Sequence, residues 1–76
     1  MTERLPSLKP REVLRALERA DFVVSRVSGS HWRLVHRSDP ARKLTLPLHN
    51  DDLKRGTLRA IIAQAGLTRE EFLKLL

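Results

Sequence analysis

The sequence contains no cysteine among its 76 residues. Disulfide bonds and thiolate metal sites are therefore excluded, and three histidines alone make a weak case for a metal ion. The chain also has no run of 18 apolar residues, and its first ten residues, MTERLPSLKP, are too polar for a secretion signal. We therefore expect a cytoplasmic protein that does not associate with a membrane.

Aromatic residues are scarce, since Phe22, Trp32 and Phe72 are the only ones. The core must therefore consist mostly of leucine, valine and isoleucine. A domain of this size buries roughly 60% of its unfolded surface and has no room for a deep cavity beside the core. We expect a single domain over residues 1–76, with residues 1–9 forming a loosely ordered lead-in and the function lying on a face or an edge.

Positive charge is abundant, with 15 Lys and Arg residues against 9 Asp and Glu and a net charge of +6. Arginine outnumbers lysine, and the planar guanidinium group binds phosphate through two parallel hydrogen bonds. This balance indicates a nucleic acid or an acidic protein as the partner, and charge alone does not choose between them.

The spacing of apolar residues predicts one helix, then three strands, then two helices. Helical spacing begins at Pro10 and returns near Gly56, whereas residues alternate within 21–28, 31–37 and 43–49. Thr68 and Glu71 form the capping box of a short last helix. The order predicts an α+β fold, with helices packed on one face of a three-stranded antiparallel sheet.

Such a sheet leaves its other face open to solvent, and strict alternation identifies the side chains on it. With the tryptophan and leucines of the second and third strands turned inward, the open face carries His31, Arg33, Lys43 and Thr45. A second basic cluster is expected beside it at the start of the long helix, where backbone N–H groups attract anions: Lys54, Arg55 and Arg59. The two patches together predict a track for an RNA backbone.

The role of His31 remains open from the residues alone. It could be a filler, a surface hydrogen-bond donor to phosphate, or a base. RNA carries its own nucleophile, the 2′-OH, so cleavage needs a base active near neutral pH and positive charge around the phosphate. His36 is expected to be structural, and His49 could either approach His31 across the sheet or simply begin the next loop.

Three short motifs occur in order along the chain: Gly29-Ser30-His31, Pro47-x-His49, and Leu53 followed by Gly56-Thr57-Leu58. With the sequence around them, from Pro10 to Leu76, they resemble the HicA (YcfA-like) toxins of bacterial toxin–antitoxin pairs. The resemblance implies an α-β-β-β-α fold like that of double-stranded-RNA-binding domains. It also implies a small mRNA interferase that needs no metal or cofactor, has His31 as its catalytic residue, and is neutralised by a HicB-type antitoxin covering the active site.

Two positions depart from the family pattern. Asp21 stands where glycine is common, and we expect the turn to survive because aspartate tolerates left-handed geometry. Lys9 stands where a serine-like cap is frequent, which should cost the first helix about 1 kcal/mol. Neither position belongs to the proposed site.

Three interpretations therefore follow from the sequence. In the first, the protein is an endoribonuclease toxin in which His31 is the general base and Gly29 and Ser30 let the backbone approach the phosphate. Its RNA is held by the basic residues Arg33, Lys43, Lys54, Arg55 and Arg59. In the second, it is a non-catalytic RNA-binding module whose first helix enters a minor groove. In the third, its positive surface serves an acidic protein partner.

Overall fold

The computed structural model describes residues 5–76 and contains three helices and three strands in the predicted order. The elements are α1 (Pro10–Arg19), β1 (Phe22–Ser28), β2 (His31–His36), β3 (Lys43–Pro47), α2 (Arg55–Gln64) and α3 (Arg69–Leu73). The third strand is shorter than expected because it ends at Pro47, which has no backbone N–H for the ladder.

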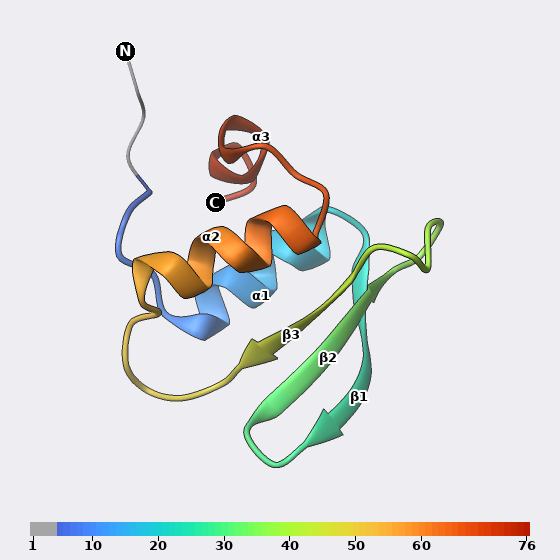
Figure 1. The fold of residues 1–76 in the computed structure, drawn as a ribbon, viewed down its shortest axis with the longest axis horizontal. Coiled ribbons are helices and arrows are strands. Elements are labelled where there is room, and N and C mark those ends of the chain that lie inside the picture. Colours follow the sequence, from blue (N-terminus) through green and yellow to red (C-terminus); the bar gives the residue numbers. More distant parts are fainter. Residues whose placement is uncertain (1–4) are drawn as a thin grey trace.

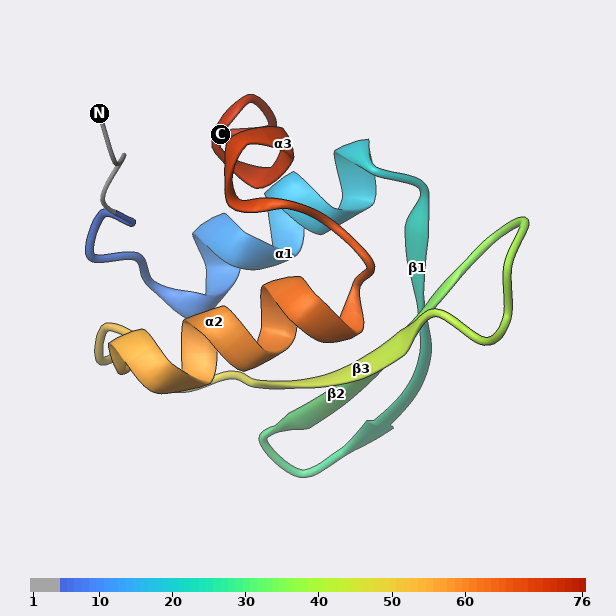
Figure 2. The same ribbon diagram turned by 45° about the horizontal axis from the view of Figure 1, so that its top comes forward.

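The strands form one antiparallel sheet in the order β1-β2-β3. Helices α1 and α2 lie side by side over one face of this sheet, and α3 lies on the side of them away from it (Figures 1 and 2). The predicted α+β fold is confirmed, and its layout is consistent with that of double-stranded-RNA-binding domains. No helix within residues 5–76 covers the other face of the sheet.

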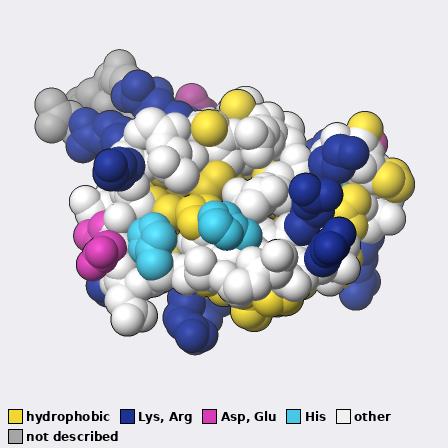
Figure 3. All heavy atoms as spheres, turned by 60° about the horizontal axis from the view of Figure 1, so that its bottom comes forward, with side chains coloured by type: hydrophobic (Ala, Val, Ile, Leu, Met, Phe, Trp, Pro, Cys, Tyr) yellow, Lys and Arg dark blue, Asp and Glu magenta, His cyan; other side chains and the backbone are white. Residues whose placement is uncertain are grey.

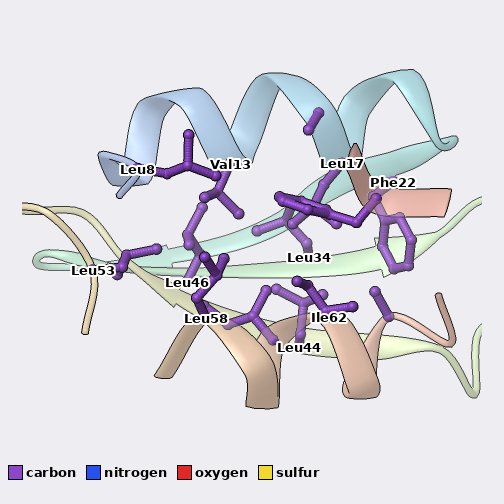
Figure 4. Packing of buried hydrophobic residues seen from close by; sticks show 14 of the residues in the cluster. Leu8, Val13, Leu17, Phe22, Leu34, Leu44, Leu46, Leu53, Leu58 and Ile62 are labelled. Atoms are coloured by element: carbon purple, nitrogen blue, oxygen red, sulfur yellow. The ribbon is translucent and has the colours of Figure 1, made fainter. Parts of the chain in front are cut away.

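The core lies between the sheet and the two longer helices. Leu34 and Leu46 are fully buried on the inner face of the sheet. Figure 4 shows Val13 and Leu17 of α1 reaching toward them from one side, and Leu58 from α2 on the other. Burial of these leucines orients the whole sheet, because each inward side chain turns its neighbours in the strand outward.

The segment before α1 is packed rather than loose. Leu5 and Leu8 are 7% and 5% exposed and belong to the core cluster. The Leu53 N–H donates to the Leu8 carbonyl at 2.8 Å, and Lys9 Nζ donates to the Asn50 carbonyl at 3.0 Å. The expectation of a loose lead-in is therefore wrong for residues 5–9, while residues 1–4 lie outside the described part of the chain.

Two tight turns depend on backbone conformations with positive φ. Asp21 has φ +69° and its carbonyl accepts a hydrogen bond from Arg37 N–H, so the helix-to-strand turn survives without glycine, as expected. Gly66 has φ +74° and ends α2, and a Cβ there would lie 2.8 Å from Arg42 Nε. That Nε donates to the Ala65 carbonyl at 2.8 Å, so Gly66 lets Arg42 tie the β2–β3 loop to the end of α2.

The helix starts differ in how they are capped. Lys9 makes no side-chain cap, as predicted, although its own N–H donates to Glu12 Oε1 at 3.0 Å. At α3, Thr68 Oγ1 accepts from Glu71 N–H at 3.0 Å and Glu71 Oε1 accepts from Thr68 N–H at 2.8 Å. The predicted capping box is therefore confirmed.

This capping box gives a pH-dependent contribution to stability. The Thr68 backbone N–H, and next the Thr68 side chain, hold the pKa of Glu71 below its ordinary value of 4.5. A carboxyl whose pKa is lower in the folded state stabilises that state above the unfolded pKa, and the contribution is lost as the pH falls through the lowered pKa. We expect Glu71→Gln to lower the free energy of unfolding most near neutral pH, with the difference shrinking below pH 4.5.

Urea denaturation of both proteins at several pH values measures this difference. Glu70→Gln is the matched control, because Glu70 lies in the same first turn and is not part of the capping box. If Glu70→Gln reproduced the pH dependence of Glu71→Gln, the capping box would not be its cause.

Candidate functional site

The uncovered face of the sheet presents three rows of side chains. Residues directly opposite each other in an antiparallel pair project to the same side of the sheet. The pairing therefore gives the rows Ser28–His31–Pro47, Arg26–Arg33–Thr45 and Val23–Val35–Lys43. His31, Arg33, Lys43 and Thr45 are all exposed on this face, as the alternation predicted.

A β-bulge at Ser25 adds two residues to this face that the sequence analysis missed. Val24 pairs with Leu34 but Arg26 pairs with Arg33, so Ser25 is an extra residue, and its hydroxyl donates to the Arg33 carbonyl at 3.2 Å. The bulge turns Arg26 and Ser28 outward, whereas strict alternation from Phe22 would turn them inward. The sequence does contain a sign of the bulge. The inward apolar residues Phe22 and Val24 are followed by an apolar residue at Val27, whereas regular alternation would place one at position 26.

A hollow of about 290 Å³ surrounds His31 on this face. Its lining consists of Arg26, Ser28, His31, Arg33 and Thr45, that is, an imidazole, two guanidinium groups and two hydroxyls. Guanidinium groups and hydroxyls are donors that suit the oxygens of an anion such as phosphate. The hollow, called the His31 hollow below, therefore has the composition of an oxyanion-binding site with a titratable group at its side.

The Gly29–Ser30 turn determines where His31 begins its strand. Ser28 pairs with His31, so the hairpin loop has two residues, and Gly29 adopts φ +58° at the first of them. Glycine is favoured at that position because its φ is positive, and a side chain would meet nothing within 4 Å. The backbone conformation of the turn therefore favours glycine here, and crowding by neighbouring atoms plays no part.

Of the two other histidines, His49 follows a residue bonded to this turn, whereas His36 lies at the opposite end of β2. The Leu48 N–H donates to the Ser30 carbonyl, which keeps the chain entering His49 beside the hairpin loop even though β3 has ended. Figure 3 shows two histidine side chains next to each other on the displayed face, with Lys and Arg side chains elsewhere on it. His36 packs edge-on against Phe22, with ring centroids 5.2 Å apart, and is structural as predicted.

The second basic cluster does not join the His31 hollow. Lys54, Arg55 and Arg59 are exposed at the start of α2. Arg55 borders a hollow with Leu5 and Leu58, and Arg59 borders another with Leu5. Because α2 lies on the covered side of the sheet, these two arginines face the N-terminal segment, and the expected continuous track is not formed through them.

Between residues 5 and 76, no three His, Asp or Glu side chains form a group that could hold a metal ion. No helix in that part of the chain is long and apolar enough to cross a membrane.

Comparison with known families supports the resemblance seen in the sequence. The family model described as "HicA toxin of bacterial toxin-antitoxin" matches residues 10–67, which run from the start of α1 to just beyond α2. The match includes the Gly29–Ser30 turn, His31 and His49, and it ends before the last helix. Comparison with curated proteins gives no match. The chain therefore belongs to the HicA family of toxins from bacterial toxin–antitoxin systems, which implies an antitoxin as its partner.

Proposed function

We propose that this toxin is a metal-independent endoribonuclease that cleaves mRNA with His31 as the general base. The observation that carries the proposal is the position of His31, exposed beside two arginines in a hollow on the uncovered sheet face. The resemblance to HicA mRNA interferases supports the same residue and the same substrate.

The His31 hollow offers the base and the positive charge that this chemistry requires. An imidazole nitrogen of His31 accepts the proton of a ribose 2′-OH while the 2′ oxygen forms a bond to the adjacent phosphorus. The bond from phosphorus to the 5′ oxygen breaks and this oxygen takes a proton from water, which leaves a 2′,3′-cyclic phosphate and a 5′-OH end. Arg26 and Arg33 stabilise the charge that develops on the phosphate oxygens, a contribution that is usually large in catalysis.

The neighbouring residues complete an RNA-binding surface in this proposal. Gly29 and Ser30 let the backbone approach the phosphate, and Lys43 extends the positive charge along β3. His49 is the candidate for a secondary role, because the Leu48–Ser30 hydrogen bond holds its backbone beside the same turn. Lys54, Arg55 and Arg59 would contact only parts of the RNA that extend beyond the sheet.

The partner proposed for this surface is a HicB-type antitoxin. Covering the His31 face would block access of RNA to the base, and an acidic partner fits the net charge of +6. Because the proposed substrate is mRNA, the proposal places the toxin in the cytoplasm.

Cleavage of a chemically defined RNA tests the proposed reaction. We expect the purified protein to cleave a single-stranded RNA in the presence of EDTA and to leave 2′,3′-cyclic phosphate ends. A 2′-deoxy nucleotide at the cleavage position removes the nucleophile and is expected to abolish cleavage there. Binding without cleavage would instead favour the non-catalytic RNA-binding module, and loss of cleavage in EDTA would contradict the metal-independent mechanism.

The role of the two arginines in the His31 hollow is tested by the salt dependence of RNA binding. The slope of log K against log salt is negative, and each lost phosphate contact on a single strand reduces its magnitude by about 0.7. We expect the double variant Arg26→Ala/Arg33→Ala to bind more weakly and to have a slope smaller in magnitude by about 1.4. Fluorescence anisotropy at several salt concentrations measures both quantities.

The matched control removes two arginines from α1. Arg11→Ala/Arg15→Ala makes the same change in charge on exposed residues of the other layer, so its slope is expected to stay close to that of the wild type. If the α1 pair changed the slope more than the sheet pair, RNA would bind through α1, as in the module interpretation.

A further inference from the structure

A second hollow, of about 340 Å³, lies at the edge of the sheet formed by β3, next to the His31 hollow. Its lining consists of Arg33, Lys43, Leu44, Thr45 and Gln64. Arg33 and Thr45 line both hollows, so the two adjoin at these side chains. The second one, called the Gln64 hollow below, is not explained by the proposed cleavage step.

The position of Gln64 follows from the edge of the sheet. β3 is an outer strand, and α2 packs against it with Leu58, Ile61 and Ile62 buried. Gln64, the last residue of α2, is exposed and borders the hollow beside the first residues of β3. Lys43 is four residues before Pro47, the partner of His31, so the far end of the Gln64 hollow is about 13 Å from His31 along the strand.

The chemistry of the Gln64 hollow differs from that of the His31 hollow. Its cations, Arg33 and Lys43, suit a phosphate, but Gln64 is uncharged and contributes nothing to phosphate neutralisation. Its side-chain amide offers both a donor and an acceptor, and this pair matches the edge of a nucleobase. Sequence-specific recognition of RNA uses unstacked bases of single strands, whose edges are hydrogen-bonded by such side chains.

We propose that the Gln64 hollow binds one nucleobase of single-stranded RNA that flanks the bond at His31, and that Gln64 selects this base. The inference rests on the proposed function for the place of the cleaved bond. The Lys43 ammonium and the shared Arg33 hold the adjacent phosphates, while the Gln64 amide reads the base edge. Gln64 is thus a specificity-determining residue for the site on the sheet.

Binding of short RNAs to a protein that does not cleave them tests the inference directly. In a His31→Ala background, single-stranded oligonucleotides that differ at one position are compared for all four bases. We expect a preference on the order of tenfold at one position, which Gln64→Ala reduces to near equality by weakening binding of the preferred base, while affinity for RNAs with the other bases changes little. Gln64→Glu removes the amide donors and is expected to shift the preference toward bases that present a donor.

Thr57→Ala is the matched control on the same helix. Thr57 is exposed seven residues before Gln64, on the same face of α2 but about 10 Å nearer its start, and it does not line the hollow. Its substitution is expected to leave the base preference unchanged. An equal effect of Thr57→Ala and Gln64→Ala would overturn the assignment of Gln64.

The outcomes separate this inference from the proposed function. A base preference that persists in Gln64→Ala, or no preference at any position with Gln64 intact, overturns the inference even if the wild type cleaves RNA. A Gln64-dependent preference in a protein whose wild type does not cleave supports the base site and contradicts the nuclease proposal.

Discussion

Replacing His31 by alanine is expected to lower the rate of RNA cleavage by on the order of 10²–10⁴, the usual contribution of a positioned general base. His31 is exposed and lies at the start of β2, so its removal leaves the core residues untouched. The wild type and the variant are therefore compared as folded proteins, by single-turnover cleavage of the same RNA. In bacteria, induction of the variant is expected to spare growth that the wild type arrests.

Two further measurements separate a base from a structural role. Added imidazole is expected to restore part of the activity of His31→Ala, because the side chain lined an open hollow that a small base re-enters. His36→Gln is the matched histidine control, since His36 packs against Phe22 at the other end of β2, and it is expected to keep cleaving. Equal cleavage by wild type and His31→Ala would contradict the assignment of the base.

The open face was predictable from the sequence because the inward residues of β2 and β3 are large and regularly spaced. Leu34, Leu44 and Leu46 must be buried, and a period of two then leaves His31 and Arg33 outside. The pattern needs no knowledge of long-range contacts. It was sufficient to predict the α+β fold and the face that carries the proposed site.

The errors arose where one residue broke the alternation or where packing depends on distant segments. The extra residue Ser25 shifted Arg26 to the open face, and strict alternation could not show it. Leu5 and Leu8 are apolar residues in a polar segment, and their burial depends on contacts with Leu53 and α2 that only the tertiary structure reveals. These corrections matter for function, because the first adds an arginine to the His31 hollow.

RNA cleavage is also expected to depend on the stability of the fold, since the proposed site lies on β2, the central strand of the sheet. Leu34 on β2 is fully buried between Val24 and Leu44 of the neighbouring strands. We expect Leu34→Ala to lower the free energy of unfolding by about 2–5 kcal/mol, the usual cost of lost burial plus the cavity that remains. A domain of 76 residues has a total stability of roughly 4–11 kcal/mol, so this change removes a large part of it.

Urea denaturation monitored by the fluorescence of Trp32 measures the loss as a lower midpoint. Val27→Ala on β1 is the matched control, because Val27 is 53% exposed and its truncation is expected to change stability by no more than about 0.5 kcal/mol. Cleavage by Leu34→Ala is expected to fall only in proportion to the unfolded fraction, since the groups of the His31 hollow remain. A loss of less than about 1 kcal/mol in Leu34→Ala would contradict the packing of the sheet against α1 and α2 on which the exposure of His31 depends.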